Sequence, residues 1–94
     1  MRKFGNDKPE LMSFTLGSGK KVYNIPLAAS MPATLILKMQ KAYQDGEIAA
    51  FEFQLDILKK YIGNAADDLT AGDVRDIFNA WTEDSKDQGA EVGE

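Results

Sequence analysis

The segment from Glu47 to Ile62 constrains the fold most, because it carries apolar side chains on two sides of one predicted helix. Gly63 and Asn64 follow it and are typical of a helix C-terminus. At about 100° per residue, its apolar residues form one stripe of Ile48, Phe51, Leu55, Leu58 and Ile62 and a second, roughly opposite stripe of Phe53, Ile57 and Tyr61. A helix on the surface of a domain has a single stripe. The segment is therefore either covered on both sides or presents one face to a partner.

A second helix is predicted over residues 32–44. Ser30 or Met31 serves as its N-cap, Pro32 suits its first turn, and Asp45-Gly46 is a stop signal. Its apolar face consists of Leu35, Ile36, Met39, Ala42 and Tyr43. Leu37 points away from that face, among polar residues.

A third helix is predicted over residues 71–85, with a strong start signal. The Thr70 hydroxyl can accept a hydrogen bond from the Asp73 amide, and the Asp73 carboxylate can reach back to the Thr70 amide. Leu69 and Val74 are spaced as a hydrophobic staple. The helix has one narrow apolar stripe, formed by Val74, Ile77, Phe78 and Trp81.

A β-hairpin is predicted over residues 12–25, before the helices. The segment from Met12 to Leu16 alternates apolar and polar residues, as a half-buried strand does. The glycines of residues 17–20 favour a turn. The segment from Lys21 to Ile25 is rich in β-branched and aromatic residues, and Pro26 follows it. An isolated hairpin is barely stable in water. We therefore expect the helices to support it.

Together these segments predict a mainly α (α+β) fold: a short N-terminal hairpin and three helices in a single globular domain over residues 11–85. Residues 1–10 read as a flexible arm. Residues 83–94 contain five acidic residues and one lysine. The net charge of −4 of the 94-residue chain is therefore located in this C-terminal segment. With one isolated valine, residues 86–94 are predicted to be a disordered acidic tail.

The residue types absent from the chain limit its chemistry. It has no cysteine and no histidine, so it lacks thiolate ligands, a thiol nucleophile and the commonest general base. We expect no enzyme activity, no cofactor and no metal site. No apolar run approaches the ~20 residues that span a bilayer, and the N-terminus does not resemble a signal peptide. These features predict an intracellular protein without a membrane segment.

The aspartates before and within residues 71–85 are better explained by the helix start than by a cation. An EF-hand loop counted from Asp67 places Gly72 correctly at its sixth position, but Leu69 and Phe78 fall at ligand positions. Negative charge near a helix N-terminus is favourable in itself.

Nucleic-acid and phosphate binding are also disfavoured. Arg75 is the only cation on a helix whose outward residues are mostly acidic, whereas a DNA-reading helix meets a polyanion. Basic residues are not interleaved with the aromatic ones as RNA binding requires. The run from Gly17 to Lys21 lacks the spacing of a phosphate-binding loop and is explained by the hairpin turn.

The second apolar stripe of residues 47–62 is the strongest candidate for a functional surface in the sequence. Phe53, Ile57 and Tyr61, extended by Leu37, form a candidate protein-binding patch. The alternative is that the hairpin lies over this stripe. The pattern alone leaves both open.

The layout resembles a known family. The residues that carry the resemblance are the hairpin, Ile25-Pro26 before the first helix, the break at Asp45-Gly46-Glu47, and Leu69-Thr70 leading into Val74, Ile77, Phe78 and Trp81. Over residues 12–85 this arrangement is similar to the tail assembly chaperones of siphovirus-type bacteriophages, especially those infecting actinobacteria.

The resemblance implies a non-enzymatic function in the host cell cytoplasm. Such chaperones bind the long apolar tape measure protein and keep it soluble while tail tube subunits assemble around it, and they are often made in a second, longer frameshifted form. The chaperone is then expected to be absent from the mature virion. Two alternatives remain: a small structural or scaffold subunit of a virion, and a small regulatory protein-binding module.

Overall fold

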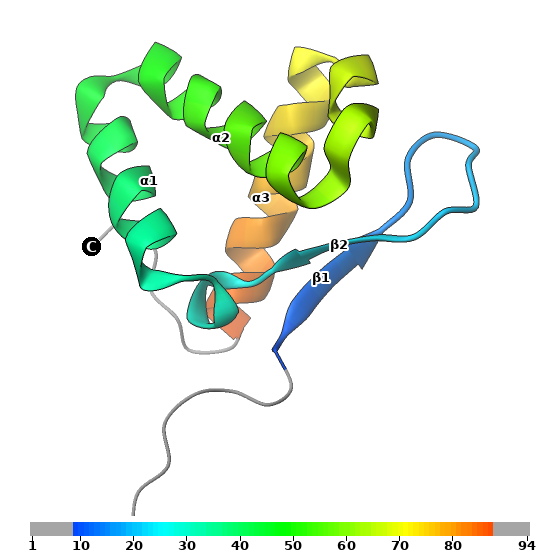
Figure 1. Ribbon diagram of the computed structural model, residues 1–94, viewed down its shortest axis with the longest axis horizontal. Coiled ribbons are helices and arrows are strands. Elements are labelled where there is room, and N and C mark those ends of the chain that lie inside the picture. The colour runs from blue at the N-terminus through cyan, green and yellow to red at the C-terminus, as the bar shows by residue number, and fades with distance from the viewer. Residues whose placement is uncertain (1–8, 88–94) are drawn as a thin grey trace, which may run out of the picture.

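The computed structural model describes residues 9–87 and has the expected mainly α fold with an N-terminal hairpin (Figure 1). Its elements, in chain order, are β1 (Leu11–Phe14), β2 (Tyr23–Pro26), the 3-10 turn η1 (Ala28–Ser30), α1 (Ala33–Asp45), α2 (Glu47–Ile62), the 3-10 turn η2 (Gly63–Asp68) and α3 (Ala71–Asp87). The predicted arm and acidic tail lie mostly outside the described residues, except that α3 continues to Asp87, two residues beyond its predicted end.

The two strands pair antiparallel, with Met12 opposite Ile25 and Phe14 opposite Tyr23. Pairing stops at Phe14, two residues earlier than the sequence predicts, and a loop of residues 15–22 joins the strands. Figure 1 shows this loop extending beyond the helices. Within the loop the Gly19 amide donates to the Leu16 carbonyl at 3.0 Å.

The helix ends follow the predicted signals with one correction. The bounds of α2 are those predicted, and Gly46, with φ 122°, makes the corner between α1 and α2. The N-cap of α1 is Pro32 itself, not Ser30 or Met31. Ser30 is engaged elsewhere, because its hydroxyl accepts a hydrogen bond from the Glu10 amide at 2.9 Å.

The start of α3 confirms the predicted capping arrangement. The Thr70 amide donates to the Asp73 carboxylate at 3.0 Å, and the Asp73 amide donates to the Thr70 hydroxyl at 3.1 Å. Val74 is fully buried and Leu69 packs against the core. Asp73 therefore serves the helix start.

A single apolar cluster joins the hairpin to all three helices. It contains Met12, Ile25, Leu27, Met31, Met39, Ile57, Leu58, Ile62, Ala66, Val74, Phe78 and Trp81. β2 packs against α2, so the sheet lies on the helices as the sequence predicts. Within residues 9–87, no helix has the length and apolar character that crossing a membrane requires.

Two buried side chains of α3 tie it to the segment after the hairpin. The Trp81 indole N–H donates to the Pro26 carbonyl at 2.8 Å. The Ser85 hydroxyl accepts from the Ala28 amide at 3.1 Å. These bonds link residues 55 and 57 positions apart, and they hold the end of α3 against η1.

Candidate functional site

The four residues predicted as a contact patch do not form one exposed surface. Ile57 is 2% exposed and belongs to the core. Phe53 and Tyr61 are half-buried and pack against that core, so only Leu37 is exposed. The arrangement supports the alternative in which the second stripe of α2 is largely covered.

Instead, the exposed apolar side chains of α2 come from the N-terminal half of its first stripe. Ile48 is the most exposed large apolar residue of the described chain, and Phe51 is also exposed. Leu58 and Ile62 of the same stripe are buried. The first half of α2 therefore exposes the face opposite to the candidate protein-binding patch.

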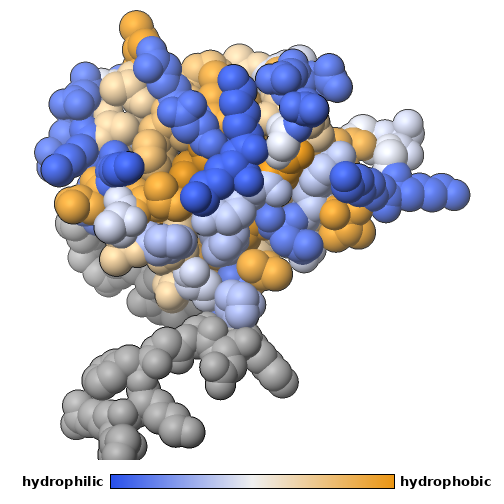
Figure 2. Space-filling view, in the orientation of Figure 1, coloured by the Kyte–Doolittle hydropathy of each residue, from blue (hydrophilic) through white to orange (hydrophobic). Residues whose placement is uncertain are grey.

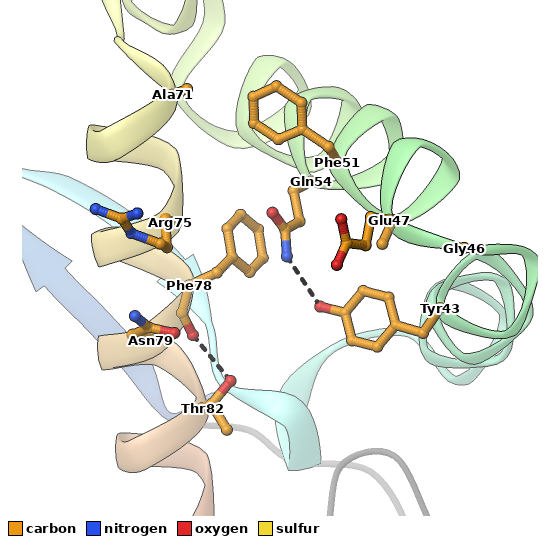
Figure 3. A pocket seen from close by; sticks show the side chains of 11 residues that line it. Tyr43, Gly46, Glu47, Phe51, Gln54, Ala71, Arg75, Phe78, Asn79 and Thr82 are labelled. Atoms are coloured by element: carbon orange, nitrogen blue, oxygen red, sulfur yellow. Dashed lines mark hydrogen bonds between the residues drawn. The ribbon is translucent and has the colours of Figure 1, made fainter.

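Phe51 of this face lines a groove of about 780 Å³ between α2 and α3, with Tyr43 and Gly46 of the α1–α2 corner at one end (Figure 3). Its walls are Tyr43 of α1, Gly46, Glu47, Ala50, Phe51 and Gln54, and Ala71, Arg75, Phe78, Asn79 and Thr82 of α3. In Figure 3 the rings of Tyr43 and Phe78 point into the space between the helices. Figure 2 shows apolar side chains gathered between α1 and α2, with hydrophilic side chains beside them.

The polar groups of the groove lie around an aromatic floor. The Gln54 amide donates to the Tyr43 hydroxyl at 3.2 Å and fixes the Tyr43 ring across the corner. The Thr82 hydroxyl donates to the Phe78 carbonyl within α3. Arg75 forms an exposed ion pair with Asp76 at 3.8 Å, and in Figure 3 its guanidinium points away from the groove. Although six of the eleven lining residues are polar or charged, most of the exposed surface of the groove is apolar, which suits an apolar ligand.

A second hollow, of about 560 Å³, lies between the hairpin loop and α3. Asp68, Asp73 and Asp76 line it together with Leu16, Tyr23 and Ile77. Among residues 9–87, no group of three or more acidic side chains is arranged to hold a metal ion. The hollow therefore supports no cation site from the described residues.

The Tyr61 phenol belongs to a half-buried side chain of α2 that packs against the core. Desolvation by burial raises its pKa above the ordinary value of 10.0. Its neutral form is thus favoured in the folded chain.

Comparison of the chain with protein-family models, with curated proteins and with solved structures finds no match.

Proposed function

We propose that the chain binds an apolar helical segment of another protein, and that it acts as a phage tail assembly chaperone for the tape measure protein. The observation that supports this proposal is the aromatic groove between α2 and α3, with the exposed Ile48 next in the chain to Glu47 of its wall. An amphipathic helix docks by placing its apolar face in such a groove. Tyr43, Phe51 and Phe78 provide the apolar contacts of the occupant.

The polar groups of the groove are compatible with binding without chemistry. The polar groups at the groove are amides, hydroxyls and two charged side chains of opposite sign, Glu47 and Arg75. Shielding an apolar client requires a contact surface and no reactive group. The resemblance to tail assembly chaperones supplies the identity of the client.

Co-expression with the tape measure protein tests the proposal. The client is expected in the soluble fraction with the wild-type chain and in the pellet without it. Ile48→Ser removes the most exposed apolar contact and is expected to weaken binding about tenfold, the effect of losing one buried aliphatic side chain.

The matched control is Val22→Ser in the hairpin loop, since Val22 is 57% exposed and Ile48 is 77% exposed. It is expected to leave binding unchanged. A client that is equally soluble without the chain contradicts the proposed function. Loss of binding with Leu37→Ser but not with Ile48→Ser would place the contact at the residue predicted from sequence, not at the groove.

A further inference from the structure

The outer edge of β1 has its main-chain groups directed away from the sheet. The Leu27 amide donates to the Glu10 carbonyl at 2.9 Å, one residue before the paired strands begin. Hydrogen-bonded and non-hydrogen-bonded pairs alternate along an antiparallel ladder. The main-chain groups of Leu11 and Ser13 therefore point outward, away from β2. Among the described residues, no backbone hydrogen bond joins these two to an element other than β2.

The opposite edge of the hairpin is partly occupied, at Pro26. Pro26 has no N–H to leave unpaired, and its carbonyl accepts the hydrogen bond from the Trp81 indole. α2 packs on β2, whereas β1 packs extensively only on β2 among the described elements. The hairpin therefore has one edge available for another strand.

That edge belongs to a short strand of four residues, which is one of the usual protections, but it lacks charge and proline. Natural edge strands are guarded by charged side chains or proline against pairing with another chain. The run from Leu11 to Gly19 contains neither, and Leu11 is an exposed apolar residue. The unguarded edge is thus suited to accept a strand.

The charges at the two ends of the hairpin have opposite signs. Lys20 and Lys21 are exposed in the loop at its tip. At its base lies Glu10, whose amide is bonded to Ser30 of η1, and η1 is bonded in turn to Ser85 of α3. The acidic Glu83 and Asp84 precede Ser85. Figure 1 shows the end of α3 near the start of β1 and the tip on the far side of the molecule.

We propose that β1 pairs antiparallel with β1 of a second copy of the chain, centred on Ser13, and forms a continuous four-stranded sheet. This register places Ser13 beside Ser13 of the second copy and pairs the outward groups of both strands, and Leu11 lies beside Thr15, the first loop residue of that copy. It also brings the basic tip of each hairpin toward the acidic base of the other. A two-fold axis makes this contact self-complementary, whereas parallel pairing would place like charges together.

The charge pattern selects a second copy over another extended segment. One hairpin carries both the basic and the acidic end, so each copy offers the complement of the other. This surface is separate from the groove between α2 and α3. The proposal therefore stands independently of client binding.

Cross-linking through a single introduced cysteine tests the pairing, since the chain has none of its own. Opposed hydrogen-bonded residues in an antiparallel pair have Cα atoms about 5.5 Å apart, within the range of a disulfide. Ser13→Cys is expected to form a covalent dimer under mild oxidation at least about tenfold faster than Asn24→Cys. Asn24 is the matched control because it lies opposite Ser13 on the covered strand, and both substitutions remove the 2.6 Å hydrogen bond between these side chains.

Sedimentation of the full chain provides the second measurement. The apparent mass is expected to rise from 10.4 kDa toward twice that value with concentration. Leu11→Lys places a charge on the edge and is expected to weaken association about tenfold or more. Leu37→Lys on α1 is the control, since Leu11 is 44% and Leu37 is 51% exposed. Equal cross-linking of the two cysteine variants, or a mass that stays monomeric at millimolar concentration, would overturn the proposal.

Discussion

Replacing Ser85 by alanine is expected to destabilise the protein although it removes a single oxygen atom. Ser85 is fully buried near the end of α3, and its hydroxyl accepts the hydrogen bond of the Ala28 amide at 3.1 Å. In the variant that N–H loses its acceptor. A buried donor without a partner costs about 1–3 kcal/mol.

Two effects reduce this cost. Alanine favours a helix over serine by about 0.5 kcal/mol, and Ala28 is only half-buried, so water replaces part of the lost bond. We therefore expect the free energy of unfolding to fall by about 1–2 kcal/mol. For a domain of this size, that corresponds to a fall in Tm of about 4–16 °C.

Thermal or urea unfolding followed by circular dichroism measures this change, and Thr82→Ala on the same helix is its control. The Thr82 hydroxyl bonds only to the Phe78 carbonyl, one turn earlier. Such local bonding adds little to helix stability, so Thr82→Ala is expected to change the free energy of unfolding by less than about 0.5 kcal/mol. If Ser85→Ala is no more destabilising than Thr82→Ala, the bond to Ala28 does not hold α3 against η1.

Two further predictions concern the α1–α2 corner and Tyr61. Gly46→Ala is expected to lower the free energy of unfolding by about 1–3 kcal/mol, because φ 122° disfavours a side chain even where space is open. Urea unfolding measures this change. The control is Gly72→Ala within α3, where φ is not positive, and it should be neutral or stabilising. The pKa of Tyr61 is raised in the folded chain. As pH rises, the unfolded chain therefore loses the phenol proton first. The free energy of unfolding keeps its full value below about pH 10 and falls as pH rises further. Tyr61→Phe should flatten the fall in Tm between about pH 9 and pH 11, and an unchanged slope would contradict the burial argument.

Local signals in the sequence predicted the element order and several boundaries. The bounds of α2 follow from the glycines on either side of it, and the start of α3 follows from Thr70 and Asp73, because these signals act over three or four residues. The extra turns of η1 and η2 were missed, since 3-10 turns have no apolar period of their own. The end of α3 was placed too early because a polar run carries no stop signal.

The candidate site was harder to predict, because it depends on how the elements pack. The pattern of α2 identified two apolar faces but not which one the hairpin covers. The groove needs side chains from three helices, Tyr43, Phe51 and Phe78, so it depends on the α1–α2 corner at Gly46 and on the η2 connection between α2 and α3. Ser85 gave no signal, since a serine in a polar run is ordinarily exposed.

The bonds of Trp81 and Ser85 have a consequence for how the chain folds during its synthesis. A ribosome-bound fragment that ends before residue 81 contains neither bond to the segment after β2, although the hairpin and the first two helices are already present. Contacts that join distant parts of a chain form late and slow folding. We therefore expect the native arrangement of β2, η1 and α3 to form only after α3 has left the ribosome, as one cooperative step.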